Sequence, residues 1–261
     1  MRTNKIYTLI LLSLSVLMMF SCSMLSKKYE KKENEIYKIS AAGKTKIDLS
    51  NVNGRITVSR SDSISGIVID VEKIGYVRKK DLDKPLEQVL VKVDTSSDVV
   101  RISTELNKDR EWLKFNFHSN TVNYIIKVPS GIKIKIDNVN GDIDLSSLNN
   151  ESDVSLVNGE IKFDNLSGSQ SLNTTNGKIS GSIDSVKNFK VETVNGRVDL
   201  ILAKTFAGSI RAETVNGKVT TENLTISDPV TDKKTFRGYI GNKDNELRVD
   251  VVNGKITLTG K

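Results

Sequence analysis

Residues 189–200 read Phe-Lys-Val-Glu-Thr-Val-Asn-Gly-Arg-Val-Asp-Leu, and versions of this stretch return along the chain. Its Asn-Gly pair occurs seven times, usually after Val, and the second residue after the glycine is always Ile or Val. The seven pairs are Asn53-Gly54, Asn140-Gly141, Asn158-Gly159, Asn176-Gly177, Asn195-Gly196, Asn216-Gly217 and Asn253-Gly254. Apolar and charged residues alternate on both sides of the pair, which is typical of strands with one buried and one wet face.

The spacing of the pairs predicts a repeat fold. From Gly141 onward the glycines are separated by 18, 18, 19, 21 and 37 residues, the last step being close to two repeats with a degenerate Gly238 between them. A fixed period near this length is typical of stacked repeats. We therefore expect an all-β protein: a single-stranded, β-helix-like β-solenoid with rungs of 18–21 residues. Each rung would be a strand, an Asn-Gly corner, a second strand and a variable loop.

The asparagines and glycines are expected to be structural. Glycine adopts the positive φ of a sharp corner without a Cβ clash. Asparagines of stacked rungs would fall in register about 4.8 Å apart and form an amide ladder. An Asn-Gly hairpin is the rival interpretation, but one kind of turn recurring with the same flanks favours a coil.

The N-terminus predicts export and lipidation. Arg2 and Lys5 precede the apolar run Ile6 to Phe20, which has the length of a signal-peptide core and is short for a membrane span. Cys22, the only cysteine, follows this run and resembles the lipid-bearing cysteine of a bacterial lipobox, although Met19 and Phe20 depart from the usual pattern. Ser23 beside it favours an outer-membrane destination.

We expect four regions along the chain. They are a lipoprotein signal peptide (1–22), a polar tether (23–36), an N-terminal β region with the first repeat and a longer insert (37–130), and the solenoid repeats (131–261). The aromatic segment Asn107 to Asn120, which includes Trp112, would pack on the cap or form a recognition loop.

Composition argues against most catalytic and metal chemistry. His118 is the only histidine, so no histidine-rich metal site can form. The net charge of +7 is mild, and basic residues alternate with acids, which argues against nucleic-acid binding. Asp137, Asp142 and Asp144 lie around one corner and keep a polysaccharide-active β-helix enzyme, or a calcium site, as minor alternatives. We expect no catalytic residue, metal or cofactor.

The chain resembles a bacterial envelope family of adhesin-like proteins with a β-strand repeat, a domain of unknown function of the DUF4097 type. The match rests on residues 47–56 (Ile-Asp-Leu-Ser-Asn-Val-Asn-Gly-Arg-Ile), on residues 123–131 (Asn-Tyr-Ile-Ile-Lys-Val-Pro-Ser-Gly) and on the Val-Asn-Gly series. The resemblance covers about residues 45–261 and implies a repetitive β fold on exported, often anchored proteins.

The expected function is therefore a lipid-anchored envelope protein with an adhesin-like binding surface and no catalysis. The partner would be carbohydrate, peptidoglycan, or an envelope or extracellular protein, with the membrane held through the N-terminal lipid. A periplasm-facing structural or signalling component, polymerising through an uncapped end rung, is the alternative.

Overall fold

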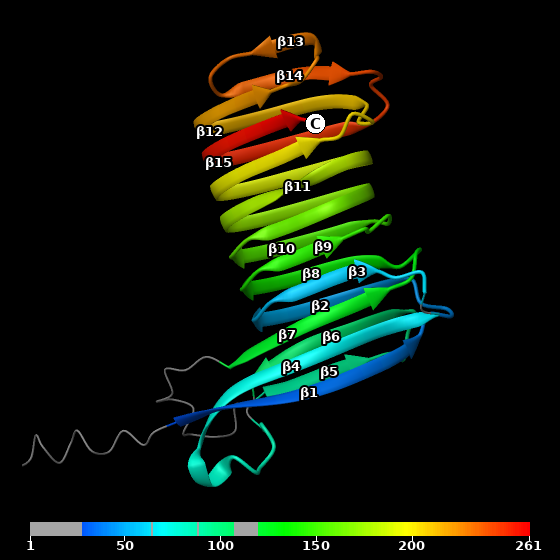
Figure 1. Ribbon diagram of the computed structural model, residues 1–261, viewed down its shortest axis with the longest axis vertical. Helices are drawn as coiled ribbons and strands as arrows, with labels where there is room; N and C mark the ends of the chain where they lie inside the picture. Colours follow the sequence, from blue (N-terminus) through cyan, green and yellow to red (C-terminus); the bar gives the residue numbers. More distant parts are fainter. Residues whose placement is uncertain (1–27, 64, 88, 107–119) are drawn as a thin grey trace, which may run out of the picture.

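The computed structural model describes residues 28–63, 65–87, 89–106 and 120–261. Their strands form one 15-stranded sheet that curls around a single hydrophobic core (Figure 1). The only helical element among these residues is the one-turn 3-10 helix Lys79–Asp81. No helix in the described part of the chain is long and apolar enough to cross a membrane. The all-β prediction is confirmed.

The strands differ widely in length. They are β1 (Lys28–Ser40), β2 (Lys46–Asn53), β3 (Ile56–Arg60), β4 (Gly66–Arg78), β5 (Val89–Asp94), β6 (Val99–Leu106), β7 (Thr121–Val128), β8 (Lys133–Asn140), β9 (Ile143–Ser146), β10 (Ser152–Asn158), β11 (Ile161–Leu202), β12 (Gly208–Glu222), β13 (Ser227–Thr231), β14 (Thr235–Ile240) and β15 (Glu246–Gly260). β11 runs unbroken through more than two repeats, because its chain coils while keeping extended backbone.

Two ladders of parallel strands enclose the core. Wall A contains the segments that precede each Asn-Gly pair, and wall B contains the segments that follow it. The asparagines are paired in register: Asn53 with Asn140, Asn140 with Asn158, Asn158 with Asn176, Asn195 with Asn253, and Asn253 with Asn216. We call the two segments joined at one pair a rung.

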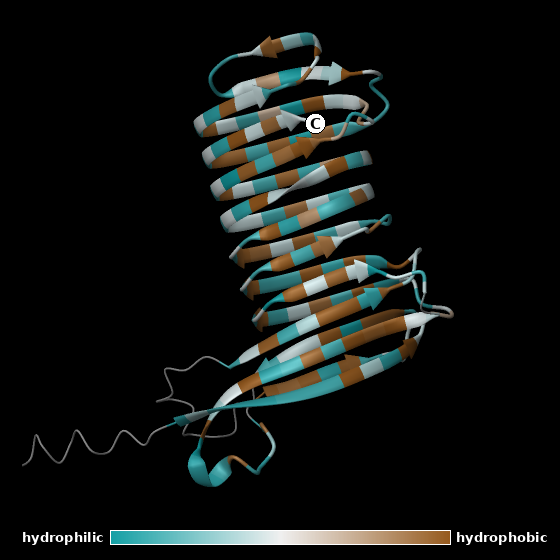
Figure 2. Ribbon diagram, viewed as in Figure 1, coloured by the Kyte–Doolittle hydropathy of each residue, from teal (hydrophilic) through white to brown (hydrophobic). Residues whose placement is uncertain are grey.

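Alternate residues of both walls point into the core. Ile134 and Ile136 of wall A and Ile143 and Leu145 of wall B are all buried. The brown bands that alternate with teal ones along each strand show this pattern (Figure 2). Burying one such side chain contributes roughly 1.5–3 kcal/mol, so the stack is held together mainly by this apolar filling.

The rungs do not stack in sequence order. β15 pairs with β11 on one side and with β12 on the other, so the rung of Asn253 lies between those of Asn195 and Asn216. The outermost rung is β12, whose residues 208–213 are covered by antiparallel β14, which in turn pairs with β13. The expectation that the last strand forms an open end is therefore wrong. Equivalent positions of all rungs carry similar residues, so the last rung can stack inside the series.

The other end of the stack is a base of longer strands. β4 pairs antiparallel with β1 and β7, and β5 pairs antiparallel with β6. The predicted tether is wrong for residues 28–36, which belong to β1. Two of the charged residues that suggested a tether, Glu33 and Glu35, are half-buried, and both of their carboxylates pair with the buried Lys73. Inward-pointing charges are a common device for protecting an edge strand.

Candidate functional site

The seven predicted asparagines lie in one column on the outer surface, at the junction of the two walls. In six of them the side-chain nitrogen donates to the side-chain oxygen of the next asparagine toward the base, and the seventh, Asn53, donates to the carbonyl oxygen of Asn120. The six bonds are Asn140 to Asn53 (2.8 Å), Asn158 to Asn140 (2.9 Å), Asn176 to Asn158 (2.9 Å), Asn195 to Asn176 (3.0 Å), Asn253 to Asn195 (2.9 Å) and Asn216 to Asn253 (2.9 Å). The column is an amide ladder that fixes the register of the rungs.

The seven glycines form a second column beside the ladder. A Cβ atom at Gly196 would lie 1.6 Å from the carbonyl oxygen of Gly177, and one at Gly141 would lie 2.2 Å from that of Gly54. The expected reason, positive φ, holds at Gly54 (+139°) and Gly141 (+122°) but not at Gly196. The reason shared by the column is close approach of neighbouring backbones, which sequence reasoning missed.

Wall A carries ion pairs between residues two apart on the same strand. They are Lys135 with Asp137 (3.1 Å), Lys190 with Glu192 (2.9 Å), Arg248 with Asp250 (2.6 Å) and Arg211 with Glu213 (3.1 Å). Hydrogen bonds from Arg211 and Arg237 lower the pKa of Glu213, and the hydrogen bond to Asp137 raises the pKa of Lys135. These side chains are largely exposed, so each pair contributes about 0–1 kcal/mol.

A groove of about 1220 Å³ runs along wall A next to the asparagine ladder. It is lined by the three residues that precede each asparagine and is closed at the last rung by residues 232–235. The residue directly before the asparagine is an exposed valine in six rungs: Val52, Val139, Val157, Val194, Val252 and Val215. The valine that recurs in the sequence is thus a surface feature and does not belong to the core.

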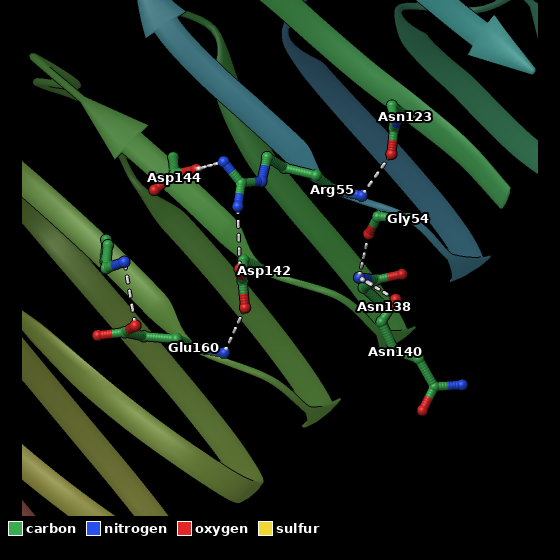
Figure 3. Close-up of polar contacts among 9 residues, drawn as sticks. Gly54, Arg55, Asn123, Asn138, Asn140, Asp142, Asp144 and Glu160 are labelled. Carbon is green, nitrogen blue, oxygen red and sulfur yellow. Dashed lines mark hydrogen bonds and ion pairs between the residues drawn. The ribbon is translucent and has the colours of Figure 1, made fainter.

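The base half of wall B is charge-neutralised. Arg55 lies within 3.1 Å of Asp142 and 3.9 Å of Asp144, and the second oxygen of Asp142 accepts a hydrogen bond from the backbone N–H of Glu160 at 3.1 Å (Figure 3). Asp137 lies on wall A and pairs with Lys135. The three aspartates considered for catalysis or calcium are therefore each occupied by a cation or the backbone. Among the described residues, no cluster of three His, Cys, Asp or Glu could hold a metal ion.

The far half of wall B is cationic. The residue two positions after the asparagine is basic in four consecutive rungs, which follow in space as Lys178, Arg197, Lys255 and Lys218. Asp199 forms ion pairs with Lys178 (3.3 Å) and Arg197 (3.0 Å), and Glu160 forms a second ion pair with Lys178 (3.6 Å). Neither Lys255 nor Lys218 has an ion-pair or hydrogen-bond partner for its side chain among the described residues. We call these four residues the basic column.

The sequence contained the signal for this column but not its order. An alignment of the second residue after each asparagine shows the four cations. Along the chain Lys218 comes before Lys255, whereas in the stack Lys255 lies between Arg197 and Lys218. Three other residues singled out from the sequence, Cys22, Trp112 and His118, lie outside the described residues.

The chain belongs to the family described as Toastrack DUF4097, whose profile matches residues 76–259. The resemblance seen in the repeats is confirmed. A comparison with curated proteins gave no match.

Two solved structures illustrate the structural likeness. One, provisionally described as a cell adhesion protein from Clostridium sporogenes, is 13% identical, covers 88% of this chain and 100% of its own, and has a TM-score of 0.45. The other, provisionally described as an adhesin from Bacteroides fragilis, is 13% identical, covers 88% of this chain and 97% of its own, and has a TM-score of 0.33. Those descriptions apply to those proteins.

Proposed function

We propose that this chain is a lipid-anchored protein of the bacterial cell envelope whose stacked rungs form a non-catalytic, adhesin-like binding surface. One observation carries the proposal: seven rungs share one register, so their exposed columns and the groove of about 1220 Å³ continue from β2 to β12. In this proposal each rung of 18–21 residues, with its Asn-Gly corner, is one repeat of a β-solenoid and adds one row to the surface.

The anchor in this proposal is Cys22, which the sequence places directly after the apolar run and six positions before β1. Lipidation there would hold the base of the sheet toward the membrane. The partner is carbohydrate, peptidoglycan or an envelope or extracellular protein. Binding would be multivalent, because one row of side chains per rung offers many weak contacts along a line.

Catalysis is not part of the proposal. An acid–base enzyme needs carboxylates held together near the bond to be cleaved. Here Asp137 pairs with Lys135 on wall A, and Asp142 pairs with Arg55 on wall B. The family description names no enzyme.

The test compares intact and outer-membrane-permeabilised cells treated with protease, using cells that carry Cys22→Ser as the control. We expect digestion of the wild-type protein on intact cells, and release of the Cys22→Ser protein from the membrane fraction. Digestion only after permeabilisation would overturn the adhesin-like role and favour the periplasm-facing structural or signalling alternative. Membrane retention of Cys22→Ser would overturn the lipid anchor.

A further inference from the structure

The basic column differs from every other charged row of the stack. On wall A, Lys135, Lys190, Arg211 and Arg248 each pair with a carboxylate two residues away on the same strand, and Lys133 pairs with Glu151. Two carboxylates, Glu160 and Asp199, pair with Lys178 and Arg197 at the base end of the column. Lys255 and Lys218 stand next to each other in register without a partner in the described structure. Like charges directly opposite each other on neighbouring strands are destabilising. The row therefore lowers the stability of the fold, and a role in folding does not explain it.

The row has a defined geometry. Neighbouring rungs of a sheet are about 4.8 Å apart, so the four cations span about 14 Å along the stack. Side-chain hydroxyls lie two residues further on in three of the rungs, at Ser180, Thr257 and Thr220. The asparagine ladder runs along the other side. The column is thus a line of cations with hydrogen-bonding side chains on both sides, all of them uncharged except Asp199.

More positive charge lies at the end of the column. The carbonyl oxygen of Lys233 accepts a hydrogen bond from Val219 at 3.0 Å, and that of Lys234 accepts one from Thr214 at 2.9 Å. These bonds hold the loop across the corner of the last rung. Its two lysine side chains make no ion pair with any residue that the structure describes.

The ligand that fits such a line is itself linear, anionic and hydroxylated. Successive rings of an acidic polysaccharide place carboxylates at intervals comparable to the rung spacing, and their hydroxyls can bond to amides and hydroxyls beside the cations. Single-stranded nucleic acids are bound with aromatic platforms for base stacking, and the rungs of the basic column carry no aromatic side chain on their outer face. A polysaccharide is therefore favoured over a nucleic acid.

We propose that Lys178, Arg197, Lys255 and Lys218 bind a linear acidic polysaccharide that lies along the stack, with its carboxylates on the cations. The assignment rests on the proposed binding role of the face and names its ligand class. The unpaired Lys255 and Lys218, at the outer end of the column, carry most of the binding. Lys178 and Arg197 extend the site toward the base, where Arg55, Asp142 and Glu160 end the cationic row.

The test titrates full-length protein in mild detergent with polygalacturonate at low and at high salt. The double variant Lys218→Gln/Lys255→Gln is compared with Lys190→Gln/Arg248→Gln, which removes the same charge from wall A, partly on the same rungs. We expect the first variant to weaken binding at least about tenfold and the second less than about threefold, with all binding weaker at high salt. Unchanged circular dichroism and denaturation midpoints show that both variants are folded.

Several outcomes would overturn the assignment: no binding of polygalacturonate, equal losses in the two double variants, equally tight binding of fully methyl-esterified polygalacturonate, or tighter binding of single-stranded DNA. The proposed function fails separately. If the protein binds polygalacturonate but is digested only in permeabilised cells, the ligand assignment stands and the adhesin-like role is overturned. If the protein is digested on intact cells but does not bind polygalacturonate, the surface-exposed role stands and the ligand assignment is overturned.

Discussion

Glycines in the stack and in the base have opposite surroundings. An added Cβ at Gly196, in the middle of the stack, would lie 1.6 Å from a carbonyl oxygen of the next rung, whereas one at Gly43, in a turn of the base, would meet nothing within 4 Å. Polar groups differ as well. Charges of the stack lie on its outer face, whereas in the base the buried Lys73 pairs with the half-buried Glu33 and Glu35.

This contrast separates two ways of building one sheet. In the stack, each residue contacts the residues at the equivalent position of the neighbouring rungs, so all members of such a column must be alike. In the base, residue identity is set by particular partners on other strands. Substitutions in a column should therefore disturb two neighbouring rungs at once, whereas substitutions in the base should act through single contacts.

The largest effect is expected from Gly196→Ala. Its Cβ would overlap the backbone of the neighbouring rung, and no flexible side chain could move aside. We expect a loss of more than about 3 kcal/mol in the free energy of unfolding, measured by urea denaturation, because strain of this kind belongs to the most damaging class of substitutions.

The matched control is Gly43→Ala. Gly43 has a φ of +72° but open space around it, so only the backbone strain of a left-handed residue applies. We expect a loss of about 1–2 kcal/mol. Equal losses for the two variants would contradict the column interpretation.

The second effect concerns the inward charges of the base. Lys73→Met leaves Glu33 and Glu35 facing inward without their cation, and removing one partner of a buried pair is strongly destabilising. Because Glu33 and Glu35 are partly exposed, we expect a smaller loss, about 2 kcal/mol at pH 7. Lys92→Met, which breaks the exposed pair with Glu105, is the control and should change the free energy of unfolding by less than about 0.5 kcal/mol.

The same variant should change the response to acid. Burial alone would raise the pKa of Glu35, but hydrogen bonds from Lys73 and Tyr37, with the charge of Lys73, hold it below its ordinary value of 4.5. A lowered pKa in the folded state gives stability that is present above pH 4.5 and is lost as the pH falls through the folded pKa. The stability difference between wild type and Lys73→Met should therefore shrink below this pH; a constant difference would exclude the pair as its source.

The same contrast explains what could be predicted from the sequence. The all-β class and the family follow from local alternation and from the Asn-Gly frame, and both are confirmed. The position of β15 could not be predicted, because the rungs of Asn195, Asn216 and Asn253 present similar residues in the same register. β1 was missed because the cation that pairs with Glu33 and Glu35 comes from β4, and a charged segment without that partner is typical of a solvated tether.

The third effect concerns the asparagine ladder. Asn158 donates to Asn140 and accepts from Asn176, whereas Asn216, on the outermost rung, makes only one ladder bond. A hydrogen bond contributes about 0.5–1.5 kcal/mol net. We therefore expect Asn158→Ala to cost about 1–2 kcal/mol and Asn216→Ala about half as much. Equal costs in thermal or urea unfolding would show that the amides act singly and not as a ladder.

The smallest expected effects concern the two halves of wall B, where removing a cation should change the free energy of unfolding in opposite directions. Arg55→Gln removes a cation paired with Asp142 and should lower the free energy of unfolding by less than about 0.5 kcal/mol. Lys255→Gln removes a cation that faces Arg197 and Lys218 in register, so relief of repulsion should raise it by about 0.3 kcal/mol at low salt. Both differences should fade in 1 M salt, where the screening length is about 3 Å. Stabilisation by Lys255→Gln together with weaker polygalacturonate binding would show that the basic column is kept for recognition at the expense of stability, whereas destabilisation would mean that Lys255 supports the stack and that its charge needs no ligand to explain it.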